Sequence, residues 1–364
     1  MTYRIIVLIL LFSSTLFSQE NEETTSFIDV NYFTGTIARH NKDISHLVKN
    51  HPDGLILGYN FKTFGKKRWQ QAYNYPDWGF SFVYHNPHNS ILGENYGVFG
   101  HYNFYFLKRN LFFRLGSGIT YANNPFDIET NFKNNAYGSS FVSSTYMMLN
   151  YNKQHIYKGF GVQGGISLIH YSNGNVKAPN SSTNTLAINI GVQYDFSEEK
   201  EQDYIRSSFE RFIEPINFNF VVRGGLNESD YIGLGQQPFA VFSAYANKRV
   251  SFLSSLQVGA EAFFAKFLQK QAEYTAAAFP TSGVTGDEDY KRVGVFVGHE
   301  LHLNDLAFVT QVGYYAYYPY EFEGRVYIRA GMNYYFTKHI FGAVTLKSHG
   351  AKAEAIEFGI GYRI

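Results

Sequence analysis

The stretch Thr185–Phe196, TLAINIGVQYDF, alternates between apolar residues and small or polar ones. The apolar positions are Leu186, Ile188, Ile190, Val192, Tyr194 and Phe196. Side chains of a β-strand point alternately to its two faces, so this pattern predicts a strand with one apolar and one polar face. The final residues, 353–364, repeat the alternation. The sequence therefore predicts an all-β protein.

The length and aromatic content of the predicted strands favour a membrane barrel over a soluble sandwich. Most runs reach about ten residues and carry aromatic residues near their ends, which is typical of transmembrane β-strands with an apolar outer face and a polar inner face. The chain has 35 Phe, 30 Tyr and 33 Gly but only 9 Pro. This composition suits strands and tight turns better than helices.

About sixteen antiparallel strands are predicted. In the first half they span Phe27–Ile37, Gly54–Phe64, Trp78–His85, Tyr96–Leu107, Leu111–Tyr121, Tyr137–Tyr151, Gly159–Ser172 and Thr185–Phe196. In the second half they span Asn217–Leu226, Pro238–Ala246, Val250–Phe267, Arg292–Leu303, Leu306–Tyr318, Arg325–Phe336, Ile340–Ser348 and Ala353–Ile364. Long and short connections tend to alternate, as in outer-membrane barrels with long extracellular loops and short periplasmic turns.

The N-terminal residues and the overall composition limit where the protein is located and what it binds. Residues 1–18 carry Arg4, a short apolar run and then small residues, which predicts a secretory signal cleaved near Ser18–Gln19. The apolar run is shorter than the roughly 20 residues that a spanning helix needs. We therefore expect an exported protein of the outer membrane. The net charge of +1 gives no sign of a nucleic-acid partner, and the absence of cysteine excludes thiol catalysis.

An internal repeat predicts two related units. The run GVFGHYNFYFLKRNLFFRLG at 97–116 parallels GVFVGHELHLNDLAFVTQVG at 294–313. The predicted units cover residues 19–196 and 216–364, and a charged periplasmic linker over 197–215 joins them. The apolar residues of this linker have the spacing of an amphipathic helix.

One motif carries chemistry. His170 and Ser172 are two residues apart at the end of the seventh predicted strand, so both lie on its outward, lipid-facing side. A serine hydroxyl beside an imidazole can attack an ester, because the imidazole removes the hydroxyl proton and returns it to the leaving alcohol. Asn184, which starts the next strand with outward parity, is the candidate to orient the imidazole. Asn173 and Gly174 are candidates to support the oxyanion.

The stretch His170-Tyr171-Ser172-Asn173-Gly174, followed by Lys177, Pro179 and Asn180, resembles the His-x-Ser-Asn signature of the PagL-type lipid A 3-O-deacylases. The resemblance extends over residues 27–196. The context also agrees with this family: a predicted signal peptide precedes an eight-strand unit, and the motif ends strand seven of eight. It implies an esterase that removes the 3-hydroxyacyl chain of lipid A, the lipid anchor of lipopolysaccharide, without a cofactor. It also implies Ser172 as nucleophile, His170 as base and Asn173 on the oxyanion side.

The sequence departs from this family at one position, since Asn184 stands where other members carry an acidic residue. An amide can orient a histidine but cannot offset the charge of the imidazolium. Two tandem eight-stranded barrels and one sixteen-stranded barrel both remain open. The complete family-sized first unit and the long linker favour the tandem barrels.

The second unit has lost the motif. Its counterpart is Leu346-Lys347-Ser348-His349-Gly350, in which serine and histidine are adjacent and therefore point to opposite faces. Inward charges at Arg325, Arg329, Glu357 and Arg363 predict a packed polar lumen. An alternative function is thus a non-catalytic barrel, structural or forming a narrow channel. The histidines at 40, 46, 85, 88 and 101 lack metal-ligand spacing, so no metal site is predicted. Oligomeric state is left open.

Overall fold

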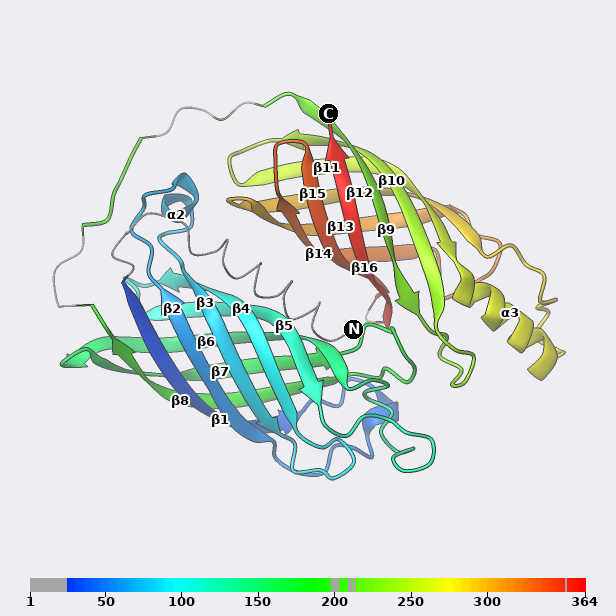
Figure 1. Cartoon of the computed structure of the whole chain (residues 1–364), viewed down its shortest axis with the longest axis horizontal. Helices are drawn as coiled ribbons and strands as arrows, with labels where there is room; N and C mark the ends of the chain where they lie inside the picture. The colour runs from blue at the N-terminus through cyan, green and yellow to red at the C-terminus, as the bar shows by residue number, and fades with distance from the viewer. Residues whose placement is uncertain (1–24, 198–202, 209–211, 213, 351) are drawn as a thin grey trace, which may run out of the picture.

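The computed structural model describes residues 25–197, 203–208, 212, 214–350 and 352–364, and in it the strands form two separate closed barrels (Figure 1). Strands β1–β8 close the first barrel through pairing of β1 with β8, and β9–β16 close the second through pairing of β16 with β9. The all-β prediction is confirmed, and of the two arrangements left open the tandem one is present. The predicted signal peptide lies outside the described residues.

The strand bounds agree with the sequence pattern to within a few residues at most ends. The first barrel consists of β1 Ser26–Ile37, β2 Asp53–Phe61, β3 Asp77–Asn86, β4 Asn95–Phe106, β5 Leu111–Ala122, β6 Phe141–Tyr157, β7 Phe160–Ser172 and β8 Thr183–Asp195. The second consists of β9 Ile216–Asn227, β10 Gln237–Arg249, β11 Ser254–Ala265, β12 Lys291–Leu303, β13 Leu306–Tyr317, β14 Val326–Tyr335, β15 Ile340–His349 and β16 Lys352–Arg363.

The alternation read from the sequence sorts side chains between the outer wall and the lumen. In β8, Ile188 and Ile190 are 66% and 70% exposed on the outer face, whereas Asn189 between them is buried in the lumen. Outward apolar side chains suit hydrocarbon, where an unpaired polar group is costly. This is the wall of a protein that spans a bilayer with strands.

Both lumens are filled by buried ion pairs. In the first barrel, Arg114 Nη2 lies 2.7 Å from Asp29 Oδ2. In the second, Arg329 Nη1 lies 2.7 Å from Glu261 Oε2, and Arg329 Nε lies 2.6 Å from Glu357 Oε2. The predicted packed lumen is therefore present in the second barrel.

One of the charges predicted to line that lumen was misplaced. Arg325 lies directly before β14 and is exposed, and its Nη1 donates to Tyr315 O (3.3 Å).

The linker contradicts the predicted amphipathic helix over its described part. Residues 203–208 form no regular element. Their backbone instead binds the β2–β3 connection: Ile205 N donates to Phe64 O (2.9 Å), and Ser207 N donates to Gln71 Oε1 (2.9 Å). Tyr75 Oη also donates to Ile205 O (3.1 Å). Contacts with the first barrel thus take the place of helical hydrogen bonds. The connection itself contains α2, Arg68–Ala72, which was not predicted.

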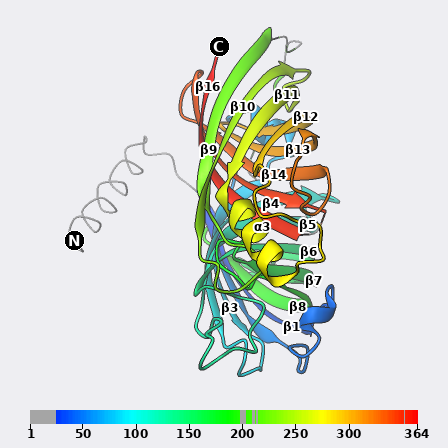
Figure 2. The same cartoon turned by 90° about the vertical axis from the view of Figure 1, so that its right-hand side faces the viewer.

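Helix α3, Lys266–Ala278, is a further departure from the predicted elements (Figure 2). Its first turn was predicted to continue the preceding strand to Phe267, and the rest was predicted to be loop. Phe267, Leu268 and Ala272 are buried against Tyr318 and Phe322 beyond the end of the second barrel. A cluster formed by residues distant in sequence stabilises this helix, so local alternation did not reveal it. Within the described residues, no helix has both the length and the apolar character needed to cross a membrane.

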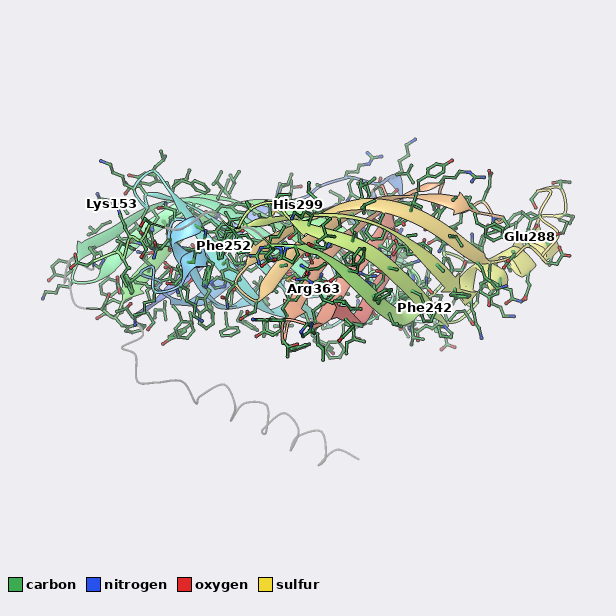
Figure 3. The ribbon with its side chains drawn as sticks, turned by 90° about the horizontal axis from the view of Figure 1, so that it is seen from above. Lys153, Phe242, Phe252, Glu288, His299 and Arg363 are labelled. Carbon is green, nitrogen blue, oxygen red and sulfur yellow. The ribbon has the colours of Figure 1, made fainter. Side chains whose placement is uncertain are left out.

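The two barrels contact each other near α2. Arg68 stacks over the ring of Phe252 at 4.3 Å, and Tyr73 Oη donates to His302 O at 2.9 Å. Figure 3 shows Phe252 of the second barrel beside this part of the first. The long loops lie at the opposite end of both barrels, where α3 is also found (Figure 1).

Candidate active site

The end of β7 and the start of β8 place His170 opposite Asn184. The two are direct cross-strand partners, and His170 Nδ1 lies 2.7 Å from Asn184 Oδ1. An amide oxygen only accepts, so Nδ1 carries the proton and Nε2 keeps its lone pair. Both side chains follow the outward parity of Ile166 and Ile188, as the alternation predicted.

Ser172 shares that parity but is covered. Its side chain is 7% exposed because the loop after β7 folds over it. Its Oγ donates to Asn180 Oδ1 (3.1 Å) and accepts from Gly174 N (3.1 Å). Within the described residues, His170 and Ser172 share no hydrogen bond. The Ser172 hydroxyl is therefore held by Asn180 and not by the imidazole.

The loop between β7 and β8 uses the polar groups of Asn173 for its own shape. Asn173 N donates to Asn180 Oδ1 (2.9 Å), and Asn173 Nδ2 donates to Lys177 O (2.6 Å). Asn173 Oδ1 accepts from Asn175 N (3.0 Å). Gly174 has φ of +61°, a left-handed conformation that glycine adopts without strain. The loop is thus built around two asparagines, Asn173 and Asn180.

Two contributors to this site were not assigned from the sequence. Asn180 was quoted only as part of the family pattern, although its Oδ1 accepts from both Ser172 and Asn173. His40 was given no role in this site, yet its Nδ1 lies 3.2 Å from Asn184 Nδ2. The only sequence signal for His40 is that β1 pairs with β8, which places the loop after β1 beside the start of β8.

An apolar groove lies on the wall next to His170 and Asn184. Leu168 and Leu186, each two residues from the pair along its strand, line the groove. Its volume is about 650 Å³, and its other apolar lining residues include Met147, Leu149, Ile166 and Ile188. The wall beside His170 and Asn184 is therefore a surface that suits a hydrocarbon chain.

The same place in the second barrel lacks this arrangement. His349 is buried in the lumen with Nδ1 3.4 Å from Glu354 Oε2, whereas the neighbouring Ser348 follows the outer face. The β15–β16 connection is a tight turn at Gly350 rather than a long loop. Among the described residues, no group of three or more His, Asp and Glu is placed to hold a metal ion.

The fold defines a β-barrel membrane protein made of two tandem eight-stranded barrels, and the outer wall of the first barrel carries the candidate site. The family model described as lipid A 3-O-deacylase (PagL) matches residues 53–193, and that described as acyloxyacyl hydrolase, C-terminal domain, matches residues 216–364. Together these matches span most of both barrels, and the chain belongs to the PagL family of lipid A deacylases. The resemblance seen in the His-x-Ser-Asn stretch is confirmed.

Other comparisons add little. No curated protein matches the chain. Among solved structures, a mutant porin of Rhodopseudomonas blastica is 9% identical, with 93% of this chain and 100% of the porin covered and a TM-score of 0.21. CdiB from Acinetobacter baumannii is 10% identical, with 94% of this chain and 60% of CdiB covered and a TM-score of 0.20. Scores this low carry no argument.

Proposed function

We propose that this protein is an outer-membrane esterase that hydrolyses an ester-linked acyl chain of lipid A, with Ser172 as nucleophile and His170 as base. The observation that carries the proposal is the 2.7 Å bond from His170 Nδ1 to Asn184 Oδ1, two residues before Ser172 on the outer face of the same strand. This bond fixes the tautomer in which Nε2 can accept a proton.

The chemistry proceeds in two halves. Substrate binding releases the Ser172 hydroxyl from Asn180, and His170 Nε2 takes its proton as Oγ attacks the ester carbonyl. Collapse of the tetrahedral intermediate breaks the bond to the alcohol oxygen of the sugar, which receives the proton from His170. A water molecule then attacks the acyl-serine ester with the same base, and free fatty acid leaves.

Backbone N–H groups next to Ser172 supply the oxyanion donors in this proposal. Gly174 N now donates to Ser172 Oγ, and movement of Oγ toward His170 frees that N–H for the developing oxyanion. Asn173 has two donors, and both are engaged: its backbone N–H donates to Asn180 Oδ1 (2.9 Å) and its Nδ2 to Lys177 O (2.6 Å). Release of Asn180 on substrate binding would free the backbone N–H together with the Ser172 hydroxyl, so this N–H is the second oxyanion donor in the proposal. Asn184 orients His170 but does not compensate its charge.

The surroundings fit a lipid substrate. The apolar groove beside His170 can take the acyl chain of a lipid that diffuses laterally in the outer leaflet. This explains a catalytic pair on the outer wall rather than in the lumen. We infer that the predicted signal over residues 1–18 delivers the protein to the outer membrane.

Mass spectrometry of lipid A tests the proposal. The full chain and Ser172→Ala are expressed in a Gram-negative host whose lipid A is fully acylated, and insertion of both is checked by heat-modifiable migration. We expect the wild type to remove the mass of one hydroxyacyl chain and the variant to remove none. Unchanged lipid A with both proteins inserted would instead support the structural-barrel alternative, which planar-bilayer conductance can then examine.

A further inference from the structure

Glu228 begins the β9–β10 loop of the second barrel and reaches into the β7–β8 loop of the first. Its side chain is 5% exposed. One carboxylate oxygen, Oε2, accepts from Ala178 N at 3.0 Å, and the other, Oε1, accepts from Gly235 N at 3.1 Å. A single buried carboxylate thus connects the candidate active-site loop to a loop of the other barrel.

Further hydrogen bonds make this junction specific. Glu228 N donates to Asn175 O (3.0 Å), and Asn175 Nδ2 donates to Glu228 O (2.9 Å). Gln236 Nε2 donates to Val176 O (2.8 Å). Glycine at 174 is also required here, because a Cβ on Gly174 would lie 2.2 Å from Ile356 Cγ1 of β16. The second barrel therefore contacts the loop along most of its first half.

These contacts lead directly to the nucleophile. Ala178, held by Glu228, is two residues before Asn180, whose side chain holds both Ser172 Oγ and Asn173 N. Lys177 O, next to Ala178, accepts from Asn173 Nδ2. The path from Glu228 to Ser172 therefore passes through hydrogen bonds and one short chain segment.

We propose that Glu228 is a positioning residue for the active site, and that the second barrel serves to hold the β7–β8 loop in the shape that presents Ser172. This inference rests on the proposed esterase function. A carboxylate suits the task because charge-assisted hydrogen bonds to backbone N–H are stronger than neutral ones. Removal of Glu228 leaves the buried Ala178 N–H without its acceptor.

The test compares Glu228→Ala and Glu228→Gln with Asp230→Asn in the purified full chain. Asp230 lies two residues further along the same loop and pairs with Lys352 rather than with the first barrel. Amide hydrogen exchange over residues 173–180 measures the loop independently of activity. Deacylation kinetics on purified lipid A then give kcat and KM separately.

We expect Glu228→Ala to raise exchange at Ala178 at least about tenfold, and to lower kcat about 10- to 100-fold with little change in KM, because small displacements of a nucleophile are costly. Glu228→Gln retains one carbonyl oxygen and should fall between wild type and Glu228→Ala. Asp230→Asn should match the wild type in both measurements.

Unchanged exchange and unchanged kcat in Glu228→Ala would overturn the proposal. If that variant raises exchange throughout the second-barrel strands, the isosteric Glu228→Gln takes its place under the same criteria. An inactive wild type would remove the proposed esterase, while the exchange data would still decide whether Glu228 holds the loop.

Discussion

The β7–β8 end of the first barrel and the β15–β16 end of the second occupy equivalent places in two related barrels, yet only the first has the candidate site. In the first, His170 and Ser172 share the outer face and a long loop covers the serine. In the second, Ser348 and His349 are adjacent, a tight turn follows, and the histidine faces the lumen. The two ends therefore share a serine and a histidine but differ in the spacing of these residues along the strand and in the length of the loop, and the proposed esterase function requires both features of the first barrel.

Replacement of the two histidines gives the largest contrast between the barrels. We expect His170→Ala to reduce deacylation roughly 1000-fold or more, because the general base is lost, and His349→Ala to leave the rate within about twofold of the wild type. Rates of fatty-acid release from lipid A measure both. Equal losses of deacylation rate in the two variants would contradict a site that is confined to the first barrel.

Asn184 is the next largest test, because its side chain is the hydrogen-bond partner of the His170 imidazole. Asn184→Ala removes the acceptor for His170 Nδ1 and should lower kcat about 10- to 100-fold. Asn184→Asp supplies a carboxylate that offsets the imidazolium charge and should raise kcat above the wild type. A lower kcat for Asn184→Asp than for Asn184→Ala would contradict this role.

The lumens offer a comparison of stability. Arg329 is fully buried between Glu261 and Glu357, while Arg114 of the first barrel has Asp29 as its ion-pair partner. Removing one partner of a buried pair costs about 3–5 kcal/mol. We expect Arg329→Ala to lower the free energy of unfolding of the second barrel by about 3–5 kcal/mol. In urea, the unfolding transition of the second barrel should therefore move to a lower concentration, while the transition of the first barrel stays in place. A single unshifted transition would show that this network contributes little.

The smallest expected effect concerns the long loops. Backbone N–H bonds from Thr285 (2.7 Å) and Gly286 (3.0 Å) lower the pKa of Glu288, and similar bonds from Thr130 and Glu129 lower the pKa of Asp127 in the first barrel. A carboxyl group whose pKa is lowered by folding stabilises the folded state at pH values above the pKa of the unfolded state. This stabilisation is lost as the pH falls through the pKa of the folded state. The Thr285 amide NMR signal should therefore titrate with a midpoint below 4.5, and Glu288→Gln should abolish that titration. A midpoint at or above 4.5 would contradict these contacts.

The sequence predicted the barrel well because alternation in a membrane wall is enforced on every strand by hydrocarbon outside and a packed lumen inside. It also paired His170 with Asn184, since parity and hairpin order fix cross-strand neighbours. It did not reveal α3 or the path of residues 203–208, because contacts with distant segments determine both. For the same reason Asn180, His40 and Glu228 were missed: each reaches the site through a loop, where no periodicity applies.

The linker has a consequence for how strongly the barrels must bind each other. Ile205 and Ser207 attach it to the β2–β3 connection of the first barrel, so the covalent path to β9 is short. A short tether keeps two binding surfaces at an effective concentration of the order of millimolar. The hydrogen bonds at Glu228 then act between groups that the tether already holds close together. Were the chain cut between the barrels, the same bonds would have to act between separate molecules at their much lower bulk concentration.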